Sequence, residues 1–274
     1  MMRTVIVIIS GIIGSVVLAV LPFVIYDAVL LIRRPLKRLY RQRSQESDYR
    51  SLDSIPDEFV RILLLLEDEF FYKHRGIRVR AIRGALRINL KQGMIIAGGS
   101  TITQQLMKNL YFKSFEKRYL RKIAEVLLAL WAEVALGKTK ILEMYMNIIY
   151  FGNGIYGVSE AARFYFDKDI KDLNLNQMYL LASIPKAPTR GNPIQYPEVF
   201  ERLRNKNIDF FVECGLLSDE ERDEIISHDA SCLDEELRNP DEYTDNYPQY
   251  IVMTNEKYGP DPVIRIGENY EISA

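Results

Sequence analysis

The sequence has few of the residues that build metal centres and disulfide frameworks. Its 274 residues include two histidines, His74 and His228, and two cysteines, Cys214 and Cys232. Their spacing matches no metal-ligand pattern, and a single cysteine pair does not imply a disulfide. A zinc-binding fold and a disulfide-rich fold are therefore disfavoured, and two free thiols are the simpler interpretation.

Internal repeats, low-complexity tracts and strand patterns are also scarce. Extended patterns occur only near the end of the chain, at residues 247–259 and 263–273. Hydrophobic residues make up 48% of the sequence, which is enough for a substantial core and excludes a disordered chain. Helical periodicity dominates elsewhere and predicts helices at residues 54–74, 77–92, 121–136, 139–147, 159–166, 175–185 and 197–213. The sequence therefore predicts a mainly α-helical chain.

The net charge of −1 conceals an asymmetry along the chain. Residues 1–200 carry 29 basic and 18 acidic side chains, whereas residues 201–274 carry 7 basic and 19 acidic ones. The first part is expected to favour anionic partners such as lipid headgroups, phosphates or nucleic acid. A solvated tail is the simplest interpretation of the acidic end.

An uncharged segment near the beginning of the chain predicts a membrane anchor. No charged residue occurs from Thr4 to Tyr26, a length that can cross a hydrocarbon core of about 30 Å as a helix. A cleaved signal peptide is the alternative, but no convincing cleavage site follows. Residues 33–43 contain six basic residues and no acid, which by the positive-inside rule would place the main domain in the cytoplasm. The same stretch could instead lie along the membrane and bind anionic lipid.

Glu67 is the first candidate for chemistry, because an apolar leucine run ends in this carboxylate. On a helix over residues 54–74, Glu67, Phe71 and His74 would share one face. Apolar and aromatic neighbours would raise the pKa of Glu67 towards neutrality, which suits a general acid or base. A surface salt bridge is the alternative for such a residue.

Two further stretches have the chemistry of an anion site. Gly98 and Gly99 precede a capping box formed by Thr101 and Gln104, so a helix N-terminus with nearby hydroxyls either binds a phosphate or is simply well capped. Basic residues also surround Glu125, namely Lys117, Arg118, Arg121 and Lys122. Their electrostatic field would stabilise a departing diphosphate. A local ion pair between Arg121 and Glu125 is the simpler alternative.

Taken together, these stretches resemble glycosyltransferase family 51, the peptidoglycan glycosyltransferases. The first family motif, E-D-x-x-F-x-x-H-x-G, is matched by residues 67–76, and the second, G-[AG]-S-T-I-T-Q-Q-L-x-K-N, by residues 98–109. The third, R-K-x-x-E, is matched by residues 121–125, and I-L-E-x-Y-[LM]-N by residues 141–147. The chain departs from the family at Lys117 and Ala124, where arginine and lysine are common.

The resemblance implies a fold and a division of the chain. The expected fold is mainly α, a lysozyme-like glycosyltransferase domain with a small membrane-proximal jaw, preceded by one transmembrane helix. The expected segments are a transmembrane signal anchor at 1–32, a basic juxtamembrane linker at 33–53, the catalytic domain at 54–215 and an acidic extension at 216–274. That extension resembles the linker of class A penicillin-binding proteins. No serine-acylase motif set occurs, so a monofunctional enzyme is expected.

The resemblance also implies an activity and its residues. Lipid II would be polymerised into β-1,4 glycan with inversion and release of undecaprenyl diphosphate. Glu67 would be the general base and Glu125 the second catalytic carboxylate, with a divalent cation such as Mg²⁺ or Mn²⁺ at Glu125 as an open alternative. The expected substrate-binding residues are Asp68, Phe71, His74, Ser100, Thr101, Gln104, Lys108, Asn109, Lys117, Arg121 and Lys122. His74 is expected to order the loop beside Glu67 rather than to transfer protons.

The same resemblance decides topology and partners. The catalytic domain would lie outside the bacterial cytoplasmic membrane on a single-pass anchor. This is the opposite of the orientation that the positive-inside rule gives for the basic residues at 33–43. Expected partners are lipid II, the growing glycan strand, membrane lipids and penicillin-binding transpeptidases, and nucleic acid is not expected. A lysozyme-like glycan-cleaving enzyme and a catalytically weak membrane scaffold are the alternative functions.

Overall fold

The structure is a computed structural model, and it describes residues 21–92, 99–112, 118–186, 197–213 and 215–227. Within these ranges the chain is helical, and the one strand-like pairing among them is a bridge between Tyr150 and Tyr156. The prediction of a mainly α-helical chain is confirmed. The extended patterns predicted at 247–259 and 263–273 lie outside the described residues.

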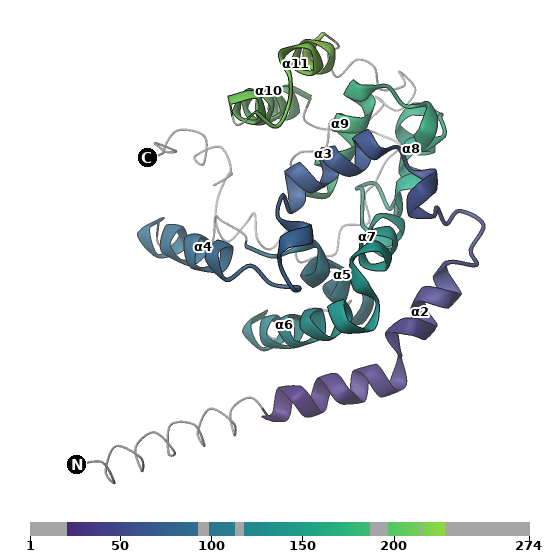
Figure 1. Ribbon diagram of the computed structural model, residues 1–274, viewed down its shortest axis with the longest axis vertical. Coiled ribbons are helices and arrows are strands. Elements are labelled where there is room, and N and C mark those ends of the chain that lie inside the picture. Colours follow the sequence, from purple (N-terminus) through teal and green to yellow (C-terminus); the bar gives the residue numbers. More distant parts are fainter. Residues whose placement is uncertain (1–20, 93–98, 113–117, 187–196, 214, 228–274) are drawn as a thin grey trace.

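The helices follow one another with short connections (Figure 1). Residues 21–33 are helical. The longer helices after them are α2 Leu36–Arg43, α3 Asp57–Glu67, α4 Val79–Gln92, α5 Ile102–Tyr111, α6 Arg118–Ala135, α7 Gly137–Ile148, α8 Val158–Phe166, α9 Leu175–Ser183, α10 Pro197–Glu213 and α11 Asp219–Ile226. Short 3₁₀ turns occur at η1 Leu52–Ser54, η2 Phe71–Lys73, η3 Ile170–Asp172 and η4 Ile184–Lys186.

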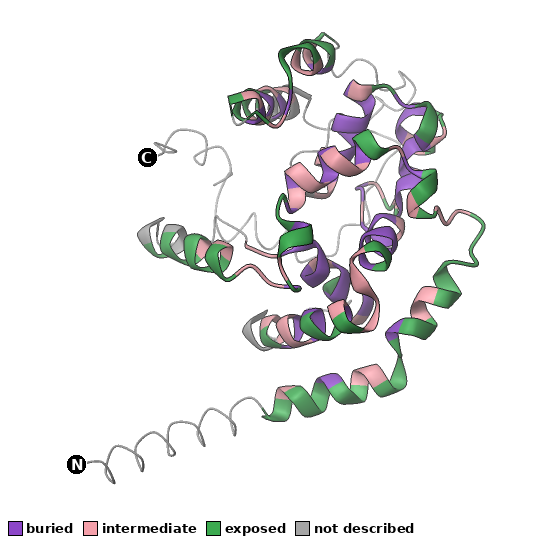
Figure 2. Cartoon of the chain, in the orientation of Figure 1, coloured by how far each residue is buried: buried purple, intermediate pink, exposed green. Residues whose placement is uncertain are grey.

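Helices α5, α7 and α9 form the centre of the core. Figure 2 shows α7 and α9 buried along most of their length. Helix α7 is buried at six consecutive positions from Ile141 to Met146, and α9 at every position from Asn176 to Ala182. A helix that is apolar on most sides must be surrounded by other elements. Accordingly, α9 packs against α3, and α5 packs against α6 and α7.

The predicted anchor and linker are described only in part. The apolar run ends within the helical residues 21–33, while residues 1–20 lie outside the described part of the chain. In the described residues, no helix combines the length and apolar character needed to span a membrane. Helix α2 buries Leu36 and packs Leu39 and Tyr40 on the core, so its apolar side is covered by the domain and its basic side chains remain exposed.

Helix α3 ends earlier than predicted, and this changes the setting of Glu67. The helix stops at Glu67 because the next residue, Asp68, adopts φ −162° and ψ 73°. Phe71 and His74 therefore follow in the turn η2 and the residue after it, and they do not share a helical face with Glu67. Asp68 stops the helix through its tertiary contacts, since its carboxylate bonds to distant parts of the chain.

The acidic end begins with a helix that the sequence analysis did not predict. Ser218 and Glu221 form a capping box at the start of α11. Leu217 and Ile225 are buried in the common core, and Glu221 is ion-paired with Arg61 of α3. The first residues of the predicted extension therefore pack on the catalytic domain, and residues 228–274 lie outside the described part.

Besides the helical residues 21–33, helices α4 and α6 each keep several large apolar side chains exposed. On α4 these residues recur at helical spacing with exposed arginines between them, and Figure 2 shows most of the described part of this helix in green, as exposed. They are Val79, Ile82, Leu86 and Leu90. On α6 they are Ile123, Leu130, Trp131 and Val134, the last 81% exposed. In Figure 1, α6 and the helical residues 21–33 lie in the lower part of the view, and α4 lies at mid-height on the left.

Candidate functional site

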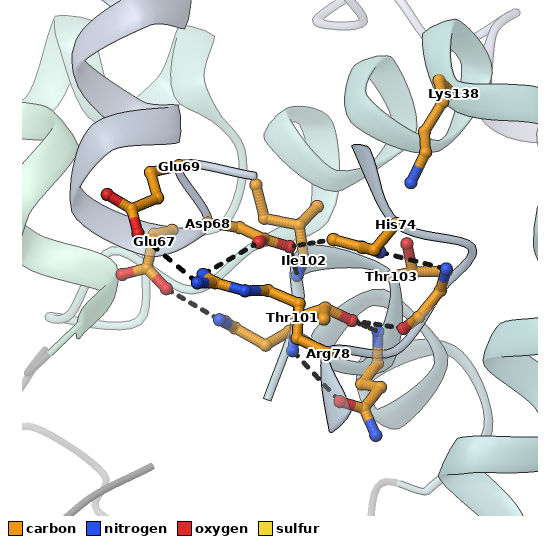
Figure 3. Close-up of polar contacts among 12 residues, drawn as sticks. Glu67, Asp68, Glu69, His74, Arg78, Thr101, Ile102, Thr103 and Lys138 are labelled. Atoms are coloured by element: carbon orange, nitrogen blue, oxygen red, sulfur yellow. Dashed lines mark hydrogen bonds and ion pairs between the residues drawn. The ribbon is translucent and has the colours of Figure 1, made fainter. Parts of the chain in front are cut away.

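A buried carboxylate joins the loop after α3 to the beginning of α5. Asp68 is 2% exposed, and its Oδ2 atom accepts a hydrogen bond from the backbone N–H of Ile102 at 3.1 Å. The Arg78 guanidinium lies 3.7 Å from Oδ1 and also reaches Glu69 (Figure 3). An anion is stabilised at a helix N-terminus, because the free N–H groups and the helix dipole both favour negative charge there.

His74 completes this junction and has a defined tautomer. Its Nδ1 atom accepts from the Gly76 N–H at 3.1 Å, so Nε2 carries the ring proton and donates it to Asp68 Oδ2 at 2.8 Å. Gly76 has φ +84°, and a Cβ there would lie 2.8 Å from the Ala129 carbonyl oxygen. The loop can approach α6 this closely only with glycine, and this geometry suits an ordering role for His74.

Glu67 is half-buried and is held by a chain of two hydrogen bonds that begins at Tyr145. Its Oε2 atom accepts from the Gln105 side-chain N–H at 2.7 Å, and Gln105 Oε1 accepts from the Tyr145 hydroxyl at 3.1 Å. Burial raises the pKa of Tyr145 well above its usual value, and the negative charges of Glu67 and Asp68 raise it further. Tyr145 is therefore a proton donor throughout the neutral range, and it fixes which face of the Gln105 amide meets Glu67.

Glu125 lies in a separate cationic cluster on α6. It is 2% exposed, Oε1 accepts from Arg121 at 2.7 Å, and Oε2 accepts from Lys122 at 2.9 Å. Lys122 also donates to the Ser100 hydroxyl at 2.7 Å. Two cations and one carboxylate leave an excess positive charge, and partial burial weakens its screening by solvent.

Six consecutive residues connect the two glutamates. Ser100 contacts Lys122 of the cluster, Ile102 contacts Asp68, and Gln105 contacts Glu67. The first turn of α5, together with the two residues before it, therefore touches both carboxylate centres and sets their separation. This arrangement brings together the three motifs that the sequence analysis identified.

The predicted anion site at the start of α5 is taken by the protein's own groups. The Thr101 N–H donates to Gln104 Oε1, the Gln104 N–H donates to Thr101 Oγ1, and the Ile102 N–H donates to Asp68. The capping-box prediction is confirmed. The N–H groups of Thr101, Ile102 and Gln104 thus already have partners within the protein, and a phosphate contact by the glycines and hydroxyls before them stays a prediction.

The other predicted residues have varied settings. Phe71 is fully buried, and the Lys138 ammonium lies 4.2 Å from the centroid of its ring. Lys108 is exposed near the end of α5, and Asn109 beside it is half-buried. Lys117 lies outside the described residues. The substrate contacts expected of all these residues stay predictions.

A divalent cation at Glu125 stays a prediction. Both of its carboxylate oxygens accept from cationic side chains. Among the residues that the structure covers, no group of three or more His, Cys, Asp or Glu side chains could hold a metal ion.

Sequence reasoning missed three residues of the site. Gln105 directly follows the capping residue Gln104, so on a helix it points in a different direction, which was an available signal. Tyr145 lies in the fourth motif, but only packing brings its hydroxyl to Gln105. Arg78 lies just before α4, and nothing in its local sequence indicates that it reaches back to Asp68.

Comparisons with known proteins agree with these motifs. Residues 33–210 match the family described as Transglycosylase. Penicillin-binding protein 1A of Aquifex aeolicus is 39% identical over 78% of this chain and 29% of its own length. Penicillin-binding protein 1A of Pseudomonas aeruginosa is 44% identical over 60% of this chain and 20% of its own length.

This chain thus spans less than a third of the length of these relatives. A crystal structure of penicillin-binding protein 1A from Haemophilus influenzae aligns with a TM-score of 0.37 and 21% identity, over 81% of this chain and 21% of that chain. Family membership accordingly rests on the sequence matches. Since the family covers well over half of the chain, the protein belongs to the transglycosylase family and contains a glycosyltransferase domain of the penicillin-binding-protein type.

Proposed function

We propose that this protein polymerises lipid II into β-1,4-linked glycan and releases undecaprenyl diphosphate in bacterial cell wall synthesis. The observation that carries the proposal is the bridge formed by Ser100 to Gln105, at the start of α5. It joins a half-buried carboxylate, Glu67, to a cluster with excess positive charge around Glu125. Glycosyl transfer from a diphosphate donor needs a base on one side of the reacting carbon and cations on the other.

Glu67 is the general base in this proposal. It removes the proton from the 4-hydroxyl of the acceptor sugar as that oxygen attacks the anomeric carbon of the donor, with inversion. The bond between that carbon and the diphosphate oxygen breaks as the new bond forms. Gln105 holds Glu67 Oε2 in place by its N–H, and a base acts efficiently only when it is held within hydrogen-bond reach of its proton.

The cations of the second cluster hold the departing diphosphate. Arg121 offers a planar fork of N–H donors, and Lys122 adds a compact charge. Glu125 keeps both side chains extended along the helix by its ion pairs. Ser100 is placed beside Lys122, and the exposed Lys108 supplies a further charge from α5.

The buried members of the motifs act as positioning residues. Asp68, His74, Thr101 and Gln104 make the internal contacts described above, and Phe71 is enclosed in the core. Together they fix the loop that begins at Glu67 against α5. We assign them this role in place of direct contact with the donor.

Membrane lipid is the proposed partner of the exposed apolar surface. Helices α4 and α6 both keep large apolar side chains exposed, as do the helical residues 21–33 at the end of the predicted anchor. Arg80, Arg83 and Arg87 on α4 complement anionic headgroups. We therefore assign α4 to the membrane-proximal jaw and place the catalytic domain outside the cytoplasmic membrane, on a single-pass anchor that includes the apolar run Thr4 to Tyr26.

Polymerisation of purified lipid II by the full chain tests this function. The wild type should form glycan, and moenomycin should stop it. Glu67→Gln should abolish glycan formation, while the helical circular-dichroism spectrum stays unchanged. The matched control is Glu58→Gln, on the exposed first turn of the same helix.

Undiminished polymerisation by Glu67→Gln would refute the assignment of the base. Cleavage of preformed glycan without consumption of lipid II would instead favour the glycan-cleaving alternative. A wild type inactive in both assays would favour the scaffold.

A further inference from the structure

The fourth motif holds the segment that joins the catalytic domain to the predicted anchor. Glu143 of α7 is 8% exposed, and its carboxylate accepts three hydrogen bonds from this segment. The donors are the Tyr40 hydroxyl at 2.8 Å, the Tyr49 hydroxyl at 2.7 Å and the Leu52 backbone N–H at 2.8 Å. Such a carboxylate has no role in the proposed chemistry, and its partners all lie in residues 40–52.

Asn147 holds the same segment one helical turn later. Its Oδ1 atom accepts from the Arg50 N–H at 2.8 Å, and its Nδ2 atom donates to the Arg50 carbonyl at 2.8 Å. The amide therefore pairs with both backbone groups of Arg50, as a neighbouring strand would. The Arg50 guanidinium in turn forms an ion pair with Asp169 at 2.8 Å. We call Glu143, Asn147 and Asp169 the linker clamp.

The chain before the clamp is also held. The Arg34 guanidinium donates to the Leu110 carbonyl at 2.9 Å, and the Tyr111 hydroxyl donates to the Arg34 carbonyl at 2.6 Å. Leu36 is buried in the core immediately after them. Residues 34 and 36 at the start of the linker and residues 49, 50 and 52 at its end are therefore held by α5, α7 and the residue before η3, and the predicted linker is not a free tether.

Helix α7 carries Glu143 and Asn147 of the linker clamp, and on a different face it carries Tyr145, which supports Glu67 through Gln105. Glu143 and Asn147 are one turn apart and bind the linker, while Tyr145 lies between them in sequence and donates to Gln105. Gln105 then donates to Glu67. A rigid helix thus connects the end of the anchor to the position of the base.

We infer that the linker clamp sets the height and orientation of the catalytic domain above the membrane, where the donor's lipid chain is embedded. The inference rests on the proposed function. A donor held in a bilayer presents its diphosphate at one depth, so a domain on a loose tether would meet it in many orientations. Misplacement of a reacting group by about 1 Å can lower a rate about 100-fold. Glu143 and Asn147 are therefore positioning residues for membrane-bound donor.

The test uses the full chain in lipid vesicles and two donors. One donor is lipid II embedded in the vesicle, and the other is a short-chain, water-soluble lipid II analogue supplied without membrane. Glu143→Ala and Asn147→Ala should lose activity on the embedded donor by about ten- to hundred-fold. Their activity on the soluble donor should stay within about two-fold of wild type, since the clamp contacts neither Glu67 nor the cationic cluster. Glu160→Ala is the control, because the Glu160 side chain on α8 is 46% exposed and forms a local ion pair with Arg163.

Hydrogen exchange shows whether the linker has been released. The amides of Arg50 and Leu52 bond to the clamp, so they should exchange slowly in wild type and faster in the variants. Should Glu143→Ala fail to fold, the double variant Tyr40→Phe with Tyr49→Phe removes two of the three donors and keeps both rings. Equal loss on both donors would mean a merely structural role and would overturn the inference, as would no loss on the embedded donor. A wild type that polymerises neither donor would instead refute the proposed function.

Discussion

Two neighbouring glutamines in the first turn of α5 should have separable effects on activity and stability. Gln104 closes the capping box through the Thr101 N–H, whereas Gln105 donates to the carboxylate of Glu67 at 2.7 Å. A hydrogen bond to a charged group contributes about 1.5–3 kcal/mol. Since each 1.4 kcal/mol corresponds to about ten-fold in rate, Gln105→Ala should lower kcat by about 10- to 100-fold.

Gln104→Ala should mainly lower stability. The loss of a capping side chain costs about 0.5–2 kcal/mol, which lowers the Tm of a domain of this size by about 1–8 °C. Because the carboxylate contact of Gln105 is kept, kcat measured well below the Tm should change by less than about three-fold.

The assay combines glycan formation from lipid II, thermal unfolding and a pH–rate profile. Gln105 donates to the carboxylate of Glu67 and so favours its ionised form, and removal of Gln105 should therefore move the acid limb of the profile upwards. Tyr145→Phe tests the relay from its other end, and it should lower kcat less than Gln105→Ala because the bond to Glu67 remains. Equal kcat losses in the two glutamine variants, with no shift of the acid limb, would refute the reasoning.

Three further predictions follow from local geometry. In thermal unfolding, Gly76→Ala should destabilise the fold by about 1–3 kcal/mol, because φ is +84° and the new Cβ would meet the Ala129 carbonyl. Gly84 lies on α4 with open space around its Cβ position, so Gly84→Ala should stabilise the fold by about 0.5–1 kcal/mol. Burial raises the pKa of Tyr49 above its ordinary value of 10.0, and the adjacent carboxylate raises it further. The contribution of Tyr49 to stability is therefore complete below about pH 10 and is lost as the pH rises further. The free energy of unfolding, measured by chemical denaturation from pH 8 to 11, should fall more steeply for wild type than for Tyr49→Phe. Lys122→Ala should lower kcat/KM for lipid II by about ten-fold or more, because the charge of Lys122 stabilises the leaving group. The Tm should change little, because about half of the Lys122 side chain is solvated. An unchanged kcat/KM would show that Lys122 is not part of the donor site.

Helix α11 shows where reasoning from local sequence fell short. Its capping box at Ser218 and Glu221 was readable, yet the strong acidic character of the region favoured a solvated tail. The helix is retained because Ile225 and Leu217 reach the common core and Arg61 of α3 pairs with Glu221. Those contacts join residues far apart in the chain, and a local pattern contains no information about them.

The end of α3 shows the same limit at the site itself. The leucine run predicts the helix correctly, but its continuation to His74 was wrong. Asp68 leaves the helix in order to cap α5, more than thirty residues later, and this contact turns His74 towards Asp68 instead of Glu67. A tertiary hydrogen bond to a buried charge outweighs the small differences in helix propensity that local sequence can express.

By itself, the sequence determined the helical character of the chain, the positions of most helices and the three motifs with their two glutamates. Periodicity, capping residues and short-range charge patterns are local, so they can be read without a fold. Only the tertiary structure decided that Asp68 fills the anion position at α5, that Gln105 and Tyr145 support Glu67, and that Glu143 holds the linker. These arrangements depend on which helices pack together, because hydrogen bonds between distant residues form only after packing has brought their atoms within about 3 Å.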